Sequence, residues 1–294
     1  MRRSNLHPSN FYRHEPAIAR TFLALIVATI WAAFWAVSTG ADSVALALAV
    51  PVAPGSAGRM EYLRNLASGH VTGAHGIMRR NITSLFWEAR DAERERGLEW
   101  YDRAYSWADR TAREFDKRTL IVAHVISALS PLNVWEENLR DALRLLKRDA
   151  ANDGPTGLTV CTFRQQKQKA WHIATYGSAK PQSGNKTENF AVNIGRPWRD
   201  GPVTVDRHAR DAALHAPEGA DDVSLTDLRY ENISEAYRGA RDVLQAQGYP
   251  HVRAHEVQAV VWIVWRRKHG GNRRFVRGRD GQPSLFPPIH PAGE

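Results

Sequence analysis

The chain has 294 residues, of which 43% are hydrophobic and 24% are charged, a composition typical of one large or two small globular domains. Its formal net charge of +9 favours nucleic acid or anionic lipid as a partner, although ordinary basic proteins also carry such a charge. The single cysteine, Cys161, excludes an intramolecular disulfide, a cysteine-ligated iron–sulfur cluster and a cysteine-rich zinc site.

The N-terminal segment, residues 1–59, differs in character from the rest of the chain. Residues 21–37 form an uncharged apolar run at the short limit for a membrane-spanning helix, with arginines before it and Asp42 after it. Three interpretations stay open: a transmembrane anchor, a signal peptide, or a translation start at Met60 that leaves residues 1–59 outside the working protein. A start near Met60 predicts a cytoplasmic protein, and the first interpretation predicts a membrane-anchored one.

From Met60 onward, the apolar periodicity is almost entirely helical. Ser130 and Pro131 suit the N-cap and first residue of a helix, and the only strand-like run is Val203–Val205. The predicted helices cover residues 81–97, 98–115, 120–129, 131–147, 163–176, 187–195, 207–216, 233–244 and 252–269. The pattern predicts an all-α domain over residues 60–271, followed by a basic tail, residues 272–294, that we expect to be disordered.

Two short segments supply an amine and a carboxylate. Lys186, in Gly184–Thr187, is one of only seven lysines beside thirty-three arginines, and a desolvated lysine can act as a nucleophile whereas arginine cannot. Asp206 follows the apolar run Val203–Val205, which predicts a partly buried carboxylate suited to acid–base chemistry. The alternative interpretation is a surface lysine and a helix-capping aspartate.

Three segments in order resemble the helix-hairpin-helix DNA glycosylase superfamily. Residues 120–130, followed by the helix that contains Trp135, resemble its apolar helix that ends in a Ser-Ala-Gln turn and is followed by an amphipathic helix. Residues 163–170 are similar to its short aromatic-to-Lys-Ala helix. Residues 181–187 resemble the hairpin, and Val205-Asp-Arg-His208 resembles the Val-Asp-x-His that follows it. The C-terminal stretch 255–267 is in addition similar to uncharacterised phage and prophage proteins.

This resemblance implies a two-lobed helical fold with a cleft between the lobes, and base excision from a nucleotide flipped out of DNA. It implies that Asp206 stabilises the developing sugar cation or activates a nucleophile, and that Lys186 can attack C1′ to form a Schiff base. His208 would orient the structure without reacting. The positions that the resemblance places against DNA are Ser130, Gly184, Asn185, Thr187 and Arg210.

A second group of residues lies near the C-terminus. Gln258, Trp262 and Arg266 recur at helical spacing on one face, where they could stack a base and hold its phosphate. The alternative is that Trp262 and Trp265 belong to the core. The chain has no metal-ligand spacing and no glycine-rich phosphate motif, so we expect neither a metal nor a cofactor.

Three hypotheses remain. The first is a monomeric, DNA-glycosylase-like enzyme that acts on a base or modified nucleotide in DNA, with a variant that modifies thymine-derived bases in phage DNA. The second is a non-catalytic basic DNA-binding protein, tethered to a membrane by residues 21–37. The third is a membrane protein whose remaining part has a role unrelated to DNA.

Overall fold

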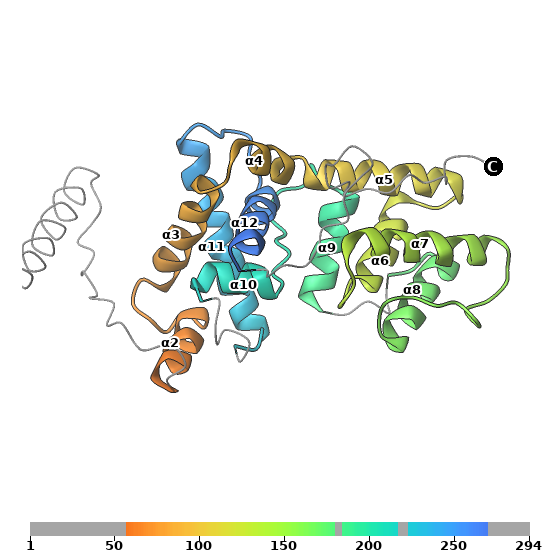
Figure 1. Cartoon of the computed structure of the whole chain (residues 1–294), viewed down its shortest axis with the longest axis horizontal. Helices are drawn as coiled ribbons and strands as arrows, with labels where there is room; N and C mark the ends of the chain where they lie inside the picture. The colour runs from red at the N-terminus through yellow and green to blue at the C-terminus, as the bar shows by residue number, and fades with distance from the viewer. Residues whose placement is uncertain (1–56, 180–183, 217–222, 270–294) are drawn as a thin grey trace, which may run out of the picture. The chain divides into compact units, whose positions relative to one another are not determined.

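The structure, a computed structural model, describes residues 57–179, 184–216 and 223–269, and in these ranges every regular element is an α-helix (Figure 1). The all-α prediction is therefore confirmed. All the described residues lie within Val52–Glu294, the larger of the two units into which the chain divides. The helices are α2 (Ala57–Ala67), α3 (Ala74–Trp87), α4 (Asp91–Leu98), α5 (Trp100–Glu114), α6 (Thr119–Leu129), α7 (Trp135–Ala150), α8 (Arg164–Tyr176), α9 (Asn185–Gly195), α10 (Arg207–Leu214), α11 (Asp227–Ala246) and α12 (Ala254–His269).

The single helix predicted over residues 81–97 is wrong, because two helices cover this stretch. α3 begins earlier, at Ala74, and α4 starts after a break at Arg90, whose backbone is extended. The Arg90 backbone N–H donates to Glu93 Oε2 at 3.0 Å, the reciprocal contact of a capping box. This contact starts a new helix in a charged stretch, residues 88–96, that has no glycine or proline to mark the break.

The predicted start of the next helix, α7, at Ser130 and Pro131 is also wrong. α7 starts at Trp135, and Ser130 is instead the residue that ends α6, where its hydroxyl donates to Ser127 O at 2.9 Å. Between them the chain turns at Leu132, which has a φ of 60°. The side-chain amide of Asn133 donates to Asp141 Oδ2 at 2.8 Å and thereby joins this turn to α7.

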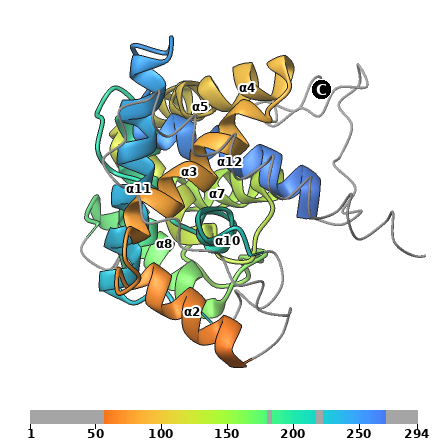
Figure 2. The ribbon, with the colours of Figure 1, turned by 90° about the vertical axis from the view of Figure 1, so that its left-hand side faces the viewer.

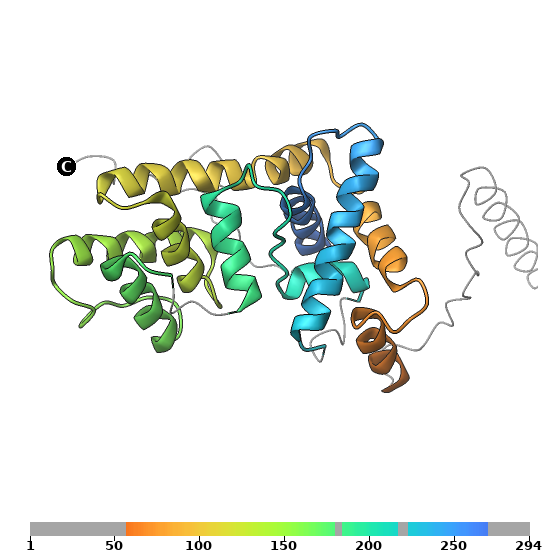
Figure 3. The same cartoon turned by 180° about the vertical axis from the view of Figure 1, so that it is seen from behind.

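The helices build two separate clusters of buried apolar side chains. α2, α3, α10, α11 and α12 share the first cluster with Val203 and Val205. α5, α6, α7, α8 and α9 form the second, in which Trp107 and Leu129 are fully buried. Figure 2 shows α3 and α11 side by side, and Figure 3 shows the long helix α11 from behind, lying across α12.

α12 connects the two clusters. It contacts α3, α4, α5, α10 and α11, and it supplies Val260 to the first cluster and Ala259 to the second. Its closest approach is to Gly97 in α4, where an added Cβ would lie 2.7 Å from Val260 Cα and 2.8 Å from Val260 N. The two helices touch backbone to backbone at this point, so only glycine fits.

α6 and α9 pack closely in the second cluster. A Cβ at Gly195, the last residue of α9, would lie 2.7 Å from Leu120 Cδ1 near the start of α6. At the opposite end of this pair, Ser127 Oγ donates to Thr187 O at 2.6 Å. The two helices therefore run antiparallel, and the start of α9 lies beside the end of α6.

Several predictions fall outside the described residues. These are the apolar run 21–37, the tail 272–294 and the hairpin residues 181–183. Among the helices in the described ranges, none combines the length and the apolar character needed to cross a membrane.

Replacing Gly97 by alanine is expected to destabilise the protein by about 1–3 kcal/mol, because the new methyl group meets the Val260 backbone, which cannot move aside. Gly76 in α3 is the matched control, since an added Cβ meets nothing within 4 Å there. Gly76→Ala should be neutral or stabilising by up to about 1 kcal/mol. Urea denaturation of both variants measures the difference, and equal stabilities would contradict the close contact.

Candidate functional site

The candidate site lies where the extended segment 203–206 meets the start of α10. This segment has no strand beside it among the described residues, yet Val203, Thr204 and Val205 are buried. The hydroxyl of Tyr230 in α11 takes the place of a neighbouring strand: it donates to Val203 O at 2.6 Å and accepts from Val205 N at 3.1 Å. Side chains thus satisfy backbone groups that would be costly to bury unpaired.

Neighbouring helices secure the same segment. From α9, the side-chain amide of Asn189 donates to Val203 O at 3.2 Å, and that of Asn193 donates to Thr204 Oγ1 at 3.1 Å. From α5, the Tyr101 hydroxyl lies 3.3 Å from Thr204 Oγ1. The segment is therefore fixed from three helices, and it delivers Asp206 to one defined position.

Asp206 is the half-buried N-cap of α10. Its Oδ1 accepts from Ala209 N at 2.8 Å, and its Oδ2 accepts from the indole Nε1 of Trp262 at 3.1 Å. The first contact confirms the helix-capping interpretation of this residue. The second joins the carboxylate to α12 across 56 positions of sequence, and nothing in the sequence pattern indicated it.

Three buried tyrosines surround this carboxylate. Burial raises the pKa of Tyr230 to about 12 and raises the pKa of Tyr101 and of Tyr237 well above the usual value of 10, and the negative charge of Asp206 contributes to all three shifts. The phenols stay protonated at neutral pH and act only as neutral hydrogen-bonding groups. Sequence analysis missed them, because isolated tyrosines carry no motif.

Lys186 lies in the first turn of α9 and is half-buried. It shares a stripe at positions i, i+3 and i+7 with Asn189 and Asn193, the two residues that bond to the 203–206 segment. Within the described residues no ion pair joins Lys186 to Asp206. The pair is thus placed on adjoining elements without being in direct contact.

Trp262 is the centre of a small aromatic and charged group. Besides its bond to Asp206, its ring lies edge-on to His208, with 6.0 Å between centroids, and the Arg266 guanidinium carbon lies 4.6 Å from its ring centroid. Trp262 is half-buried, whereas Trp265 is 1% exposed and belongs to the core. Trp262 and Arg266 therefore lie together on one face of α12, as their spacing predicts.

The third residue of that expected face, Gln258, has a structural role instead. It is buried, and its Oε1 lies 3.1 Å from the Tyr101 hydroxyl, so it is not presented to a base. Arg210, expected to contact DNA, is also buried. Its guanidinium donates to Asp211 Oδ1 at 2.9 Å and to Val223 O at 2.7 Å, which leaves it inside the protein.

The hairpin residues within the described ranges lie at the start of α9. Gly184 is its N-cap, with a φ of 103° that favours glycine, and the Thr187 hydroxyl donates back to Gly184 O at 3.1 Å. Asn185 is exposed, and its amide donates to Asp227 Oδ1 at the start of α11. Ser130 lies at the end of α6, beside the start of α9 through the Ser127–Thr187 contact.

His255, in the first turn of α12, is fully buried with its ring edge-on to Tyr101, 4.9 Å between centroids. Burial lowers the pKa of its imidazole from 6.5 to about 4, and the nearby positive charge of Arg253 contributes to the same shift. The ring is therefore neutral at pH 7 and packs against the tyrosine that contacts Gln258.

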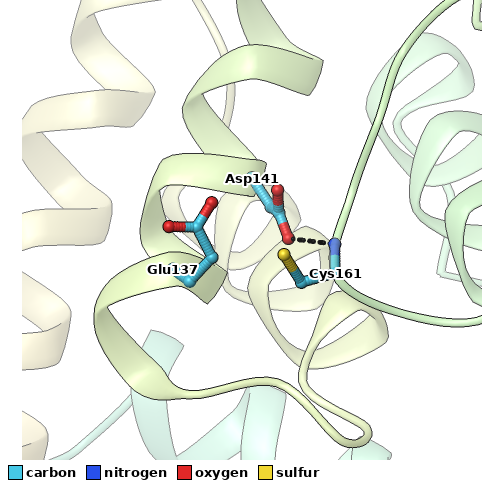
Figure 4. A group of neighbouring side chains, drawn as sticks. All are labelled: Glu137, Asp141 and Cys161. Atoms are coloured by element: carbon cyan, nitrogen blue, oxygen red, sulfur yellow. Dashed lines mark hydrogen bonds between the residues drawn. The ribbon is translucent and has the colours of Figure 1, made fainter.

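In the described part of the chain, one group of side chains has ligand atoms close enough for a metal ion: Glu137, Asp141 and Cys161, all within 4.8 Å of one another (Figure 4). Both carboxylates already have partners. Asp141 accepts from Cys161 N and pairs with Arg144, and Glu137 pairs with Arg140 at 2.9 Å and with Arg144 at 2.6 Å. The arginines neutralise the charge that would attract a cation, so this group serves to connect α7 to the 160–163 loop.

Removing the Asp206 cap is expected to destabilise the protein by about 1–2 kcal/mol in Asp206→Ala. Asp206→Asn should retain part of this stability, because its amide oxygen can still accept from Ala209 N although its NH2 group cannot accept from Trp262 Nε1. Asp153→Ala, at an exposed loop position, is the control and should have no effect. Urea denaturation measures the free energy of unfolding of each variant. An Asn variant as unstable as the Ala variant would contradict the capping role of Asp206.

Lowering the pH from 7 to 5 is expected to remove about 2 kcal/mol of stability through His255. An unfolded histidine takes up a proton below pH 6.5, whereas the buried ring stays neutral down to about 4, so this stability is present above 6.5 and lost as the pH falls. Urea denaturation at both pH values should show a smaller loss for His255→Phe than for the wild type. Equal losses would show that His255 is not the group responsible.

Comparison with known proteins places the chain in a family without assigning an activity. No curated protein matches it, and no solved structure matches it. A family model does match, over residues 69–269, which is more than half of the chain and includes α3 through α12 with the whole Asp206 site. The chain therefore belongs to DUF7178, a family of unknown function.

Proposed function

We propose that this protein is a DNA-glycosylase-like enzyme that acts on a base or modified nucleotide in DNA, with Asp206 as its essential carboxylate. The observation that carries the proposal is the Asp206 carboxylate, half-buried and positioned from α10 and α12 beside the helix that bears Lys186. The two apolar clusters, joined by α12, are compatible with the two-lobed helical fold that the resemblance implies.

The chemistry suits such a carboxylate. Cleavage of a glycosidic bond builds positive charge on the sugar, and a preorganised carboxylate in a partly buried site offsets that charge more strongly than one in water. Trp262 and Ala209 orient the two oxygens, so the carboxylate need not reorganise during the reaction. Trp262, with Arg266 stacked on it, presents a half-exposed ring beside the carboxylate, where a flipped base could stack.

Lys186 adds a second step. A neutral lysine amine can attack C1′ of the sugar and expel the base, which leaves with one amine proton. The C1′–O4′ bond then breaks as O4′ takes the second proton, which gives a Schiff base on the opened sugar and leads to strand cleavage. Gly184 and Asn185, both exposed in the turn before Lys186, are the groups we assign to the DNA backbone.

A second candidate function is non-catalytic DNA binding. Both Asp206 oxygens already accept hydrogen bonds, which is what a purely structural N-cap would do. In that case the basic chain would bind DNA through phosphate contacts alone and would excise nothing.

Borohydride trapping on DNA with an abasic site tests Lys186 whatever the target base is. The wild type is expected to form a covalent cross-link, because borohydride reduces the Schiff base to a stable amine, and Lys186→Gln should form none. Lys147→Gln is the matched control: Lys147 is an exposed lysine of α7, and its loss should leave the cross-link unchanged.

A glycosylase assay on uracil-containing and alkylated duplexes tests Asp206. Asp206→Asn keeps the helix cap and should lower the excision rate by a factor on the order of 10²–10³. If the wild type excises the base but forms no covalent cross-link, the proposed role of Asp206 stands and that of Lys186 does not. DNA binding with neither trapping nor excision would favour the non-catalytic function instead.

A further inference from the structure

The loop between α9 and α10 presents an exposed tryptophan on a rigid support. Trp198 is 62% exposed, one of the most exposed large apolar side chains in the described residues. Its ring lies edge-on to Tyr105 of α5, with 5.3 Å between centroids, so Tyr105 fixes the orientation of the indole while leaving much of it in solvent.

Three arginines and a carboxylate fasten this loop to the protein. Arg253 donates to Pro197 O at 2.6 Å, and Arg238 donates to Gly201 O at 3.2 Å. Asp200 accepts from Arg241 at 2.6 Å and from Ala254 N at 3.0 Å. The loop is therefore preorganised, and a ligand that binds Trp198 would lose little conformational entropy on ordering it.

Positive charge flanks the exposed ring. Arg196 and Arg199 are both exposed, and no ion pair in the part of the chain that the structure describes involves either of them. An exposed indole between two available guanidinium groups fits the chemistry of single-stranded nucleic acid, whose bases stack on aromatic rings while its phosphates meet arginine.

We propose that Trp198, Arg196 and Arg199 form a second nucleic-acid contact, which we call the Trp198 surface, for an unpaired strand. The surface follows the last residue of α9, and Lys186 lies in the first turn, about 14 Å away along the helix axis. The Trp198 surface and Lys186 thus lie at opposite ends of α9. The inference rests on the proposed function only for the assignment of the unpaired strand as DNA. Binding at the Trp198 surface itself requires no catalytic activity.

Fluorescence anisotropy with labelled oligo(dT) and oligo(rU), using the full chain, tests the Trp198 surface and distinguishes DNA from RNA. Trp198→Ala is expected to weaken binding of the single strand by roughly 5- to 100-fold, whereas Trp198→Phe should retain most of the affinity. Trp87→Ala, at another tryptophan exposed on α3, is the matched control and should bind like the wild type.

The salt dependence of the affinity for a single strand tests the role of Arg196 and Arg199. The double variant Arg196→Ala/Arg199→Ala should lower the slope of log K against log salt by about 1.4 for a single strand, since two phosphate contacts are lost. Arg79→Ala/Arg80→Ala removes the same charge from the exposed side of α3 and should leave the slope unchanged.

The results separate this inference from the proposed function. Abasic-site trapping on a short duplex should be unaffected by Trp198→Ala, because Lys186 remains in place. Unchanged affinity in Trp198→Ala would overturn the Trp198 surface, as would equal losses in Trp87→Ala. A wild type that binds neither oligonucleotide would also overturn it, and a protein partner would then be the alternative.

Discussion

The phenol of Tyr230 lies between two buried backbone groups and bonds to both, and much of the site follows from this contact. It donates to Val203 O and accepts from Val205 N, so one hydroxyl serves both polar groups of a segment that has no strand beside it among the described residues. Because buried backbone groups must be paired, the position of Tyr230 determines where the segment runs. The start of α10, and with it the Asp206 carboxylate, is placed accordingly.

The site is consequently assembled from distant parts of the chain. α9 supplies two asparagines, α5 supplies Tyr101, and α12 supplies Trp262 and Gln258. Each group contributes one hydrogen bond of modest net value, but the network is largely buried, so an unpaired member would be costly. Such an arrangement favours one geometry for the carboxylate over many, as catalysis by electrostatic preorganisation requires.

Periodicity and composition were sufficient to predict much of the helical fold, and the failures have physical causes. α6 was predictable because its run from Leu120 is uninterrupted by glycine or proline. The break at Arg90 was not, because the capping contact with Glu93 forms in a charged stretch that has no glycine or proline to signal a helix end. Ser130 suits either end of a helix, and only the packing of α6 decides which end it occupies.

Two residues of the candidate site, Asp206 and Trp262, were predictable from the sequence, whereas the positions of Gln258 and Arg210 were not. Asp206 followed from the apolar run before it, and Trp262 from helical spacing. Whether a polar residue in an apolar helix faces outward depends on tertiary packing, which is why Gln258 and Arg210 were expected at the surface and lie in the interior. The contact between Asp206 and Trp262 joins residues whose separation along the chain carries no local signal.

The position of α12 also bears on the order in which the protein assembles. The first apolar cluster draws its side chains from residues before 90 and after 202, so α2 and α3 must find partners more than a hundred positions away. The second cluster is nearly complete within residues 101–194 and lacks only Ala259. During synthesis from the N-terminus, the middle of the chain can therefore fold while the apolar faces of α2 and α3 remain uncovered, because their partners α10, α11 and α12 are made later. That interval is when the nascent protein is most exposed to aggregation.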